Sequence, residues 1–396
     1  MKVTLVHNYY KQPGGEDRVV EAEADLLRAA GCEVEFYVVR SQDVGEGGLE
    51  VARRVLWSRQ DYKGVQAAID RFSPDIVHVH NIFPLISVAA VKAAKARAMP
   101  LVQTLHNYRP FCLNGVLYRD GRVCTDCLQG PPLSGIVHSC YRGSRVQSVA
   151  AALAGRSQVA SGWLDDVDVF ITSSEFARQI NIRSGVPAEK IVVKPNPSFV
   201  EVAASIQNSI PSPPTFLFVG RLDERKGVRT IVEAAKAMPY TVRLVGDGDL
   251  RAALEQTVKE HGLSNVTFLG WRSKQQVAYE MASATALIVA SEFYESFGNV
   301  IVEAYAQSLP VLSSDIGAQA TLVRHGMTGL HFKTGNAEDL ASKMRLIASN
   351  DDLLRTLRRQ AAEEYQTLYT QQRNVEQLLG IYRRAIKHNE ERQGKR

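Results

Sequence analysis

The sequence predicts an α/β protein built from two doubly wound, Rossmann-like parallel-sheet domains that face a central cleft. Three observations predict this. The chain has 396 residues, which is long for one core; short β-rich runs alternate with helical segments; and a proline-rich break interrupts the alternation near the middle. We expect domains at residues 1–195 and 215–370, a linker at 196–214, and a C-terminal helix at 371–396 that could pack back on the first domain.

The first half of the chain alternates strand and helix signals. A strand is expected at Lys2–His7, followed by a helix at Asp17–Ala30 that Gly31 ends in the usual way. A second helix is expected near Ser87–Arg97. Further strands are expected at Glu33–Val39, Ile76–His80, Leu101–Leu105, Val167–Thr172 and Ile191–Lys194. Strands that alternate with helices in this way favour a parallel sheet covered on both faces.

The second half repeats the alternation after a break that begins at Lys194-Pro195-Asn196-Pro197. Prolines and serines up to Pro214 indicate a connecting segment. The strands expected after it are Thr215–Val219, Thr241–Val245, Val266–Leu269, Ala286–Ala290, Pro310–Ser313 and Gly329–Phe332. Because doubly wound sheets bind ligands beyond the carboxyl ends of their strands, a ligand is expected between the two domains.

Composition and charge exclude several classes of protein. Apolar residues make up 45% and charged residues 22%, which is ordinary for globular domains. No apolar run is long enough to span a membrane, and the first residues are typical of a buried strand, so a cytoplasmic protein is expected. Residues 92–164 carry nine Lys or Arg against Asp120 and Asp126. This bias suits a phosphate-bearing ligand or an acidic membrane surface, or is a solvated face; no nucleic-acid-binding pattern accompanies it.

The most informative motif follows the strand Thr215–Val219. It places Gly220, Arg221 and Lys226 just beyond the strand, where a guanidinium and an ammonium could converge on a diphosphate. Taken alone, the same residues would suit an ordinary charged loop at the start of a helix.

A second motif lies downstream, in Glu295-Ser296-Phe297-Gly298-Asn299-Val300-Ile301-Val302-Glu303. Gly298 would open a helix whose free N–H groups form an anion site. Glu295 could reach a sugar hydroxyl from the preceding loop, and Glu303 could accept two hydrogen bonds from a ribose diol. Two glutamates at this spacing are weak evidence alone and strong evidence beside the upstream glycine and cations.

Together these motifs resemble the family 4 retaining glycosyltransferases of GT-B fold. The resemblance extends over nearly the whole chain and is most specific from residue 215 to 332. It also includes Gly14-Gly15 after the first strand, which is similar to the family's glycine loop, and His106 after the strand Leu101–Leu105, which matches its cleft histidine. The other matching segments are Val245-Gly246-Asp247-Gly248, Phe268-Leu269-Gly270-Trp271, Glu303-Ala304-Tyr305-Ala306, Leu309-Pro310-Val311 and Gly326-Met327-Thr328-Gly329-Leu330.

The resemblance implies a role for each matching residue. Arg221, Lys226, Glu295 and His106 would form the catalytic group: the two cations neutralise the departing diphosphate, Glu295 grips the donor sugar, and His106 contacts the sugar from the other domain or is a structural histidine. The residues that would bind the donor are Gly15, Gly220, Trp271, Arg272, Gly298, Asn299, Val300 and Glu303.

The resemblance also implies a reaction: transfer of a sugar from a UDP-sugar, in preference to a GDP-sugar, to a glycan or lipid-linked saccharide with retention. No cofactor is expected for catalysis, since two cations and a helix start occupy the place of a divalent metal. Ser308 and Thr321 depart from the family pattern beside the donor cleft, which leaves the sugar open. The alternatives are a sugar-nucleotide 2-epimerase and a non-catalytic nucleotide-sugar-binding protein.

The insertion at 107–142 carries four cysteines: Cys112, Cys124, Cys127 and Cys140. The Cys-x-x-Cys pair has the spacing of a zinc knuckle, so either a structural zinc site or unligated thiols are expected. The following segment, Arg142–Arg156, mixes arginines with small apolar residues. It is either a peripheral membrane-binding helix or an ordinary packed helix.

Overall fold

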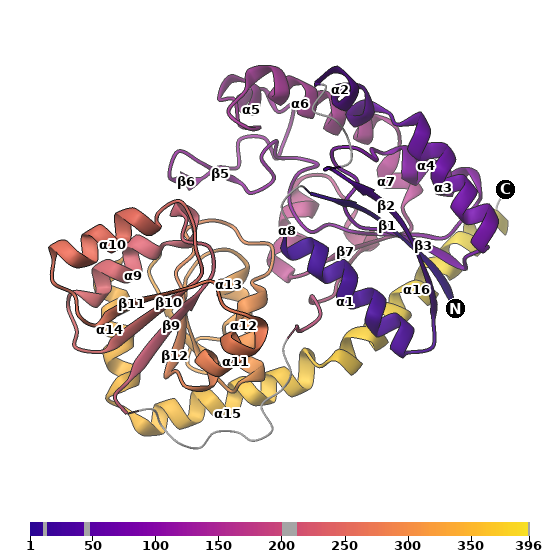
Figure 1. Ribbon diagram of the computed structural model, residues 1–396. Helices are drawn as coiled ribbons and strands as arrows, with labels where there is room; N and C mark the ends of the chain where they lie inside the picture. Colours follow the sequence, from indigo (N-terminus) through magenta and orange to yellow (C-terminus); the bar gives the residue numbers. More distant parts are fainter. Residues whose placement is uncertain (11–13, 43–47, 200–211, 395–396) are drawn as a thin grey trace. The chain divides into compact units, whose positions relative to one another are not determined.

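The computed structural model describes residues 1–10, 14–42, 48–199 and 212–394, and the chain divides into two compact units. Unit 1 comprises Met1–Leu117, Cys124–Pro197 and Gln371–Arg396, and unit 2 comprises Tyr118–Val123 and Ser198–Thr370. The boundary therefore falls at Pro197, inside the segment expected as a linker; most of that segment, residues 200–211, lies outside the described residues. Each unit contains a six-stranded parallel sheet with helices on both faces (Figure 1), which confirms the expected pair of doubly wound domains.

The sheet of unit 1 has the strand order β2-β1-β3-β4-β7-β8. Its strands are β1 (Lys2–Tyr9), β2 (Glu33–Arg40), β3 (Ile76–Val79), β4 (Leu101–Thr104), β7 (Val169–Thr172) and β8 (Ile191–Val193). The order of the strands reverses between β1 and β3, so the loops after these two strands and after β4 leave the sheet at the edge where ligands bind.

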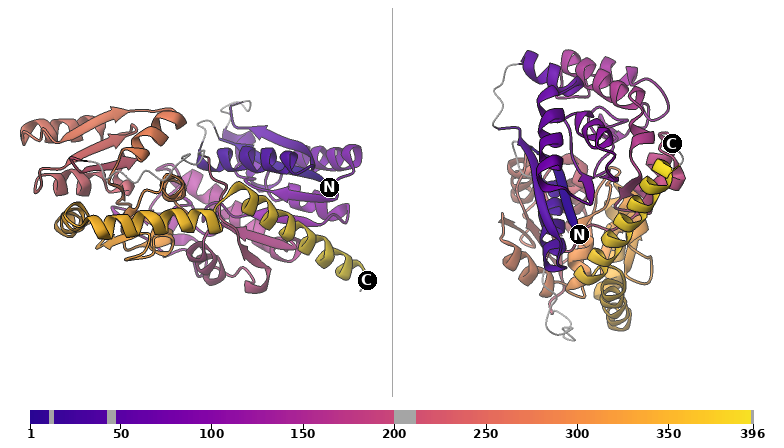
Figure 2. Two further views of the ribbon diagram at one scale, coloured as in Figure 1. Left: turned by 90° about the horizontal axis from the view of Figure 1, so that it is seen from below. Right: turned by 90° about the vertical axis from the view of Figure 1, so that its right-hand side faces the viewer.

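Helices cover both faces of this sheet. One buried cluster includes residues of α3, α4 and α7, and the other includes residues of α1 and α16. Figure 2 shows α16, in yellow, running along unit 1, where the Asn389 amide donates to the Ala98 carbonyl at 2.8 Å. The helices are α1 (Gly15–Ala29), α2 (Gly48–Leu56), α3 (Arg59–Phe72), α4 (Ala89–Ala96), α5 (Leu133–Val137), α6 (Arg145–Ala160), α7 (Trp163–Asp166), α8 (Glu175–Arg183), the 3₁₀ turn η1 (Ala188–Lys190) and α16 (Gln371–Gly394).

The sheet of unit 2 has the strand order β11-β10-β9-β12-β13-β14. Its strands are β9 (Thr215–Val219), β10 (Thr241–Val245), β11 (Val266–Gly270), β12 (Ala286–Val289), β13 (Val311–Ser314) and β14 (Gly329–Phe332). Here the order reverses between β9 and β12, which makes the loops after those two strands the expected ligand-binding position. A short antiparallel hairpin, β5 (Tyr118–Arg119) and β6 (Arg122–Val123), groups with this unit.

Two buried clusters hold the helices of unit 2 on its sheet. The first includes residues of α9, α10 and α14, and the second includes residues of α11, α12 and α15. The helices are η2 (Glu224–Lys226), α9 (Val228–Ala235), α10 (Arg251–Glu260), α11 (Lys274–Ala282), α12 (Asn299–Ala306), α13 (Gly317–Leu322), α14 (Ala337–Ala348) and α15 (Asp351–Leu368).

Several element ends differ from the expected ones by one or two residues. The expected strand at Val167–Thr172 begins only at Val169, because Val167 ends α7 and the Asp168 carboxylate accepts a hydrogen bond from the Leu101 N–H at 2.9 Å. Among the described helices, none is both long and apolar enough to cross a bilayer.

Candidate functional site

Two loops of unit 2 carry most of the expected donor-site residues. The first follows β9 and runs into η2; the second follows β12 and runs into α12. Because β9 and β12 are parallel neighbours, both loops leave the same edge of the sheet, where the strand order reverses. The first loop holds Gly220, Arg221 and Lys226; the second loop and its helix hold Glu295, Gly298, Asn299, Val300 and Glu303.

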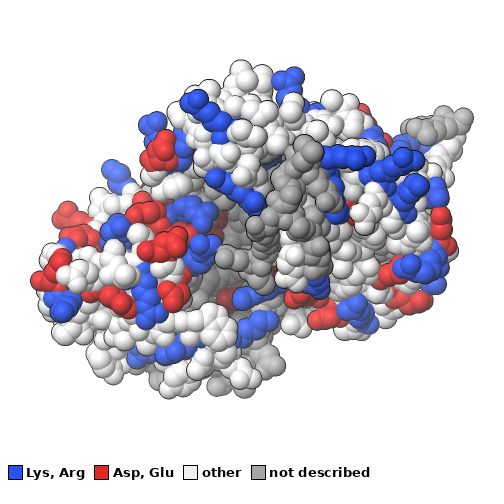
Figure 3. All heavy atoms as spheres, turned by 45° about the horizontal axis from the view of Figure 1, so that its top comes forward, with Lys and Arg blue, Asp and Glu red and all other residues white. Residues whose placement is uncertain are grey.

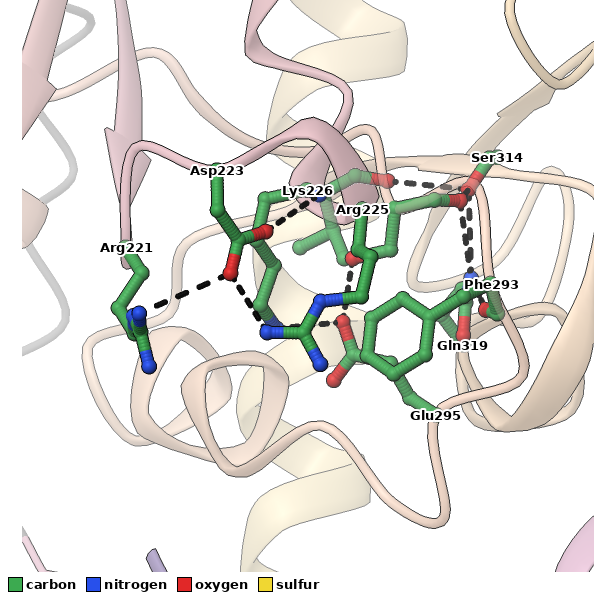
Figure 4. Close-up of polar contacts among 10 residues, drawn as sticks. Arg221, Asp223, Arg225, Lys226, Phe293, Glu295, Ser314 and Gln319 are labelled. Carbon is green, nitrogen blue, oxygen red and sulfur yellow. Dashed lines mark hydrogen bonds and ion pairs between the residues drawn. The ribbon is translucent and has the colours of Figure 1, made fainter. Parts of the chain in front are cut away.

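An ion pair joins the two loops. Lys226 Nζ lies 2.8 Å from Glu295 Oε1, and the Ser291 hydroxyl donates to the same carboxylate (Figure 4). The Glu295 side chain is 11% exposed and that of Lys226 27% exposed. Burial alone would raise the pKa of Glu295, but the Lys226 ammonium and the hydrogen bonds from Lys226 and Ser291 outweigh it and lower the pKa. Glu295 is therefore a charged, hydrogen-bonded carboxylate at neutral pH.

Asp223 organises the first loop. Its carboxylate accepts the Lys226 backbone N–H at 3.3 Å, which caps η2, and accepts a 2.7 Å bond from the Arg225 guanidinium. Arg221 has a looser contact, with Nε 3.8 Å from Asp223, and its side chain is 63% exposed. Figure 4 shows Arg221 standing apart from Glu295 on the far side of Asp223. The two cations expected at the diphosphate thus differ in how firmly their side chains are held. Lys226 is paired with Glu295, whereas Arg221 is largely exposed.

Besides Asp223 and Ser291, three further residues that sequence reasoning missed shape this site. The Phe293 ring lies under two cations, 5.5 Å from the Arg225 guanidinium carbon and 5.4 Å from Lys226 Nζ. The Gln319 amide donates to the Ser291 carbonyl at 3.3 Å, which ties α13 to the second loop. Arg225 and Phe293 lie within or beside the motifs, so proximity in sequence could have marked them; nothing in the sequence marks Gln319.

Gly298 is required at the start of α12 by its backbone conformation. Its φ is +118°, which residues with a Cβ rarely adopt, and an added Cβ would come within 3.0 Å of Ile301 Cδ1. Asn299 and Val300 then supply the first N–H groups of the helix, and Glu303 lies in its second turn, half-buried. The helix start and Glu295 therefore lie together, as the motif predicts.

The loop that contains Trp271 and Arg272, both expected to bind the donor, follows β11, two strands away from β9 at the same edge of the sheet. Trp271 is 72% exposed and the Arg272 guanidinium donates to the Trp271 carbonyl at 3.5 Å. Gly220 and Gly246 bring the ends of β9 and β10 into close contact, since a Cβ on Gly246 would lie 1.9 Å from the Gly220 carbonyl oxygen. Only glycine fits there.

In unit 1, Gly15 begins α1 and is exposed, while the preceding Gly14 donates its N–H to Asp17 at 2.7 Å. Residues 11–13, which lead into this glycine loop, lie outside the described residues. His106 follows β4 and is half-buried, with Nε2 2.9 Å from Nδ1 of His80. Burial, together with the neighbouring His7 and Lys194, lowers the pKa of His106 to about 3, so its ring is neutral at physiological pH.

His106 lines a pocket that belongs wholly to unit 1. The polar lining includes Glu16, Asn81, Asn107 and Arg109, and the apolar walls include residues of α2 and α6. Asn107 donates to the Glu16 carboxylate at 3.1 Å. Such a mixture of apolar walls with a few convergent polar groups is typical of a small-molecule site.

The four clustered cysteines all belong to unit 1, and none of the described cysteines forms a disulfide. The thiols of Cys112, Cys124 and Cys140 are near enough to Cys127 to raise its pKa, although burial is the larger cause. Among the described residues, the one group with three ligand atoms within 4.8 Å of one another is Glu23, His78 and His80. The thiols are therefore gathered, but no three of their sulfur atoms lie within 4.8 Å of one another.

Comparison with known families accounts for both units. Residues 14–197 match the family described as "Glycosyl transferase 4-like domain", and residues 202–364 match "Glycosyl transferases group 1". The chain belongs to the family 4 glycosyltransferases. This confirms the resemblance inferred from the motifs, and this family 4 glycosyltransferase carries both of the family's domains in the expected order.

Solved structures share the fold over nearly the full length. Anabaena HepE in complex with UDP has a TM-score of 0.66 at 21% identity, covering 96% of this chain and 99% of that one. A glycosyltransferase from Rickettsia africae has a TM-score of 0.70 at 17% identity, covering 98% and 99%. Likenesses at this level of identity establish the GT-B fold.

The curated relatives match shorter segments. A glycosyltransferase of Methanocaldococcus jannaschii is 36% identical over 36% of this chain and 40% of its own length. A sulfoquinovosyl transferase of Arabidopsis thaliana is 26% identical over 75% of this chain and 54% of its own. A lipopolysaccharide core glycosyltransferase of Rhizobium meliloti is 34% identical over 40% and 45%. The chain thus spans about half the length of these relatives.

Proposed function

We propose that this glycosyltransferase transfers a sugar from a nucleotide-sugar donor to a glycan or lipid-linked saccharide with retention of anomeric configuration. The proposed donor is a UDP-sugar in preference to a GDP-sugar. The observation that carries the proposal is the Lys226–Glu295 pair, which joins the loops after β9 and β12 where the strand order of unit 2 reverses. The solved HepE structures that contain UDP and UDP-glucose support the uracil base.

The donor diphosphate would lie between Lys226 and the start of α12. An ammonium has three N–H donors, so Lys226 can hold Glu295 and a phosphate oxygen at the same time. The first N–H groups of α12, at Asn299 and Val300, favour an anion at the same place. Arg221, being 63% exposed, can turn from Asp223 toward the phosphates. Glu303 would accept hydrogen bonds from the ribose, and the Trp271–Arg272 loop would lie against the base.

The proposed reaction is a front-side substitution. The bond between the anomeric carbon and the phosphate oxygen breaks, the acceptor oxygen bonds to the same face of that carbon, and the acceptor proton passes to the departing diphosphate. Glu295 suits a binding role better than a nucleophilic one, because Lys226 and Ser291 already engage its carboxylate and lower its pKa. Lys226 and Arg221 would stabilise the charge that grows on the diphosphate.

The acceptor would occupy the pocket of unit 1 that His106 lines. The wall formed by α6 has an unusual outer face, since Val146 is 81% exposed and Leu153 51% exposed. On α5, Leu133 and Val137 are also exposed, and residues 127–164 contain basic but no acidic side chains. Figure 3 shows basic side chains standing among uncharged ones on this end of unit 1. An apolar face edged with arginines suits an anionic lipid surface that presents a lipid-linked acceptor.

A thermal-shift panel of UDP-, GDP- and ADP-sugars tests the donor proposal. A bound ligand stabilises the folded state by mass action, so UDP-sugars should raise the melting temperature of unit 2 most. With an acceptor present, turnover should release free nucleoside diphosphate, whereas an epimerase would convert the donor without an acceptor. If no nucleotide sugar shifts the melting temperature, the proposal is wrong.

Liposome flotation tests the membrane proposal separately. The protein should float with vesicles that contain an anionic lipid at low salt, and should remain behind with purely zwitterionic vesicles. A variant with Val146→Asp and Leu153→Asp should lose flotation while keeping its response to donor, because both side chains are exposed. If the wild-type protein fails to float at low salt, the lipid surface is excluded.

A further inference from the structure

The clustered cysteines are tied together through the backbone of Gly135 in α5. Its N–H donates to the Cys127 sulfur, and its carbonyl accepts the Cys140 N–H at 2.9 Å. Its α-carbon is packed so closely that an added methyl group would lie 2.8 Å from Leu113, the neighbour of Cys112, and 3.5 Å from the Cys127 sulfur. Cys127 and Cys140 are therefore held by the two backbone groups of one residue, and the neighbour of Cys112 packs against the same residue.

The fourth cysteine is brought in by the chain that surrounds the hairpin. The Cys124 N–H donates to the Leu117 carbonyl at 2.8 Å, and a turn follows in which the Leu128 N–H donates to Thr125 at 3.1 Å. Cys127 lies in this turn, and Cys124 directly precedes it. An N–H donor to sulfur, as at Cys127, stabilises a thiolate. The proximity of the other three thiols opposes ionisation of Cys127, and a bound cation would reverse this effect.

We propose that Cys112, Cys124, Cys127 and Cys140 bind one structural zinc ion. Four thiols would release four protons, and four thiolates would bind Zn²⁺ at about 2.3 Å, which places the sulfur atoms about 3.8 Å apart. The sulfur atoms lie wider than this in the described structure, so binding requires rotation of their side chains toward a common centre. The ion would fix the segment that contains Leu113, which lines the unit 1 pocket.

Metal analysis of the purified full-length protein tests this proposal. One equivalent of zinc per chain is expected, and it should be released when a mercurial reagent blocks the thiols. The variant Cys124→Ser/Cys127→Ser should lose the zinc, whereas Cys32→Ser, which changes the one cysteine outside the cluster, should retain it. Wild-type protein without zinc, or zinc that persists in the double variant, would overturn the assignment.

A second inference comes from a different set of atoms, the buried polar chain behind His106. His80 Nδ1 lies 2.9 Å from His106 Nε2, and the two ring planes differ by 19° with centroids 5.2 Å apart. The rings thus meet end to end through one N–H···N bond. Burial lowers the pKa of both histidines, so each ring is neutral, with one nitrogen that donates and one that accepts.

The other nitrogen of His80 faces Glu23. His80 Nε2 and Glu23 Oε2 lie 3.6 Å apart, and in the described part of the chain neither atom has a hydrogen-bond partner. The second oxygen of Glu23 accepts a 2.6 Å bond from Lys194, which is 2% exposed. Since a buried donor and a buried acceptor without partners are costly, the two facing atoms are best explained as an N–H and a carboxylate oxygen.

The neighbouring contacts argue against a cation at this position. His78 already uses both ring nitrogens, each at 2.8 Å, one with the Tyr382 hydroxyl and one with the Thr104 hydroxyl. The Lys194 ammonium lies on the same carboxylate that a metal would need. Repulsion between that ammonium and a metal ion favours a proton on His80 instead.

We infer that Glu23, acting through His80, fixes the tautomer of His106. If Nε2 of His80 carries the proton, its Nδ1 is the acceptor, and His106 must donate from Nε2. Nδ1 of His106 is then left with a lone pair, and a sugar hydroxyl would donate to it. Glu23 and His80 are positioning residues in this account, which rests on the proposed role of His106.

Nitrogen NMR of histidine-labelled protein without substrate tests this inference apart from activity. Long-range ¹H–¹⁵N spectra distinguish the two neutral tautomers, and His106→Gln identifies the signal. His106 should be protonated at Nε2 in the wild type. In Glu23→Gln/Lys194→Met, which removes both buried charges together, the other tautomer should become populated. A wild-type His106 protonated at Nδ1 would overturn the inference, whether or not the double variant folds.

Discussion

Replacing Lys226 with methionine tests how the two loops of unit 2 are held together. Coulomb's law gives about 6 kcal/mol for unit charges 2.8 Å apart at an effective dielectric constant of about 20. Desolvation of both groups offsets much of this. Lys226→Met removes the ammonium that neutralises the 11%-exposed Glu295 carboxylate, so we expect unit 2 to lose about 2–3 kcal/mol at pH 7.5.

The pH dependence of this loss has a definite sign. In the wild type the lowered pKa of Glu295 contributes stability above its ordinary pKa, and the contribution is lost as the pH falls through the folded value. Without Lys226, burial raises the pKa instead. The variant's deficit should therefore be largest at neutral pH and shrink as the pH falls toward 5, where Glu295 can bind a proton.

Urea unfolding of the double-mutant cycle with Lys226→Met, Glu295→Gln and both together provides the assay. The double variant should lose less than the sum of the single losses, with a coupling of about 1–3 kcal/mol. Turnover by Lys226→Met should fall about a hundredfold or more. Arg229→Met, which breaks an exposed ion pair with Glu224 on the same loop, should change stability by about 0.5 kcal/mol or less. Additive single losses would refute the reasoning.

Three further predictions concern backbone conformation and buried histidines. Gly298→Ala should lower stability by about 1–3 kcal/mol and weaken the thermal shift by UDP, because φ is +118° at this residue. As a control, Gly380→Ala on the exposed face of α16 should raise stability by about 0.5–1 kcal/mol. Ser308→Gly should raise the melting temperature, since Ser308 has φ +55°, a conformation that glycine adopts without strain. The stability of unit 1, measured by urea unfolding, should fall as the pH drops below about 6.5, because buried histidines stay neutral in the folded state and bind protons in the unfolded state. The loss should reach up to ~1.4 kcal/mol per pH unit for each such histidine. An unchanged urea midpoint between pH 7 and 5 would contradict this. The histidines concerned are His78, His80 and His106.

The fold could be predicted because its signals are local. Strands such as β9 and β12 are short β-rich runs bounded by glycine or polar loops, and the helix at α12 begins at a glycine. Parallel pairing follows from the alternation, so both loops of the donor site could be assigned to one sheet edge. The exact ends of β7 and α4 could not be predicted, because contacts that end an element, such as the hydrogen bond between Leu101 and Asp168, join residues far apart in the sequence.

The site was predictable only as a set of motifs. The glycine, the cations and the two glutamates are visible as spacing, but spacing does not show that Lys226 pairs with Glu295 while Arg221 lies apart. Those pairings depend on side-chain directions across 69 residues of sequence. The chain of contacts behind His106 was missed for the same reason, since it joins Glu23 of α1 to His80 and Lys194, which directly follow β3 and β8 and share no motif with it.

Isothermal titration of the full-length protein with UDP and with UMP tests the central claim most directly, because the two ligands differ by the β-phosphate that Lys226, Arg221 and the start of α12 are proposed to hold. Each hydrogen bond to a charged group contributes about 1.5–3 kcal/mol, so UDP should bind at least about tenfold more tightly than UMP. The difference should largely vanish in Lys226→Met. Equal affinity of the wild-type protein for the two nucleotides would contradict the account.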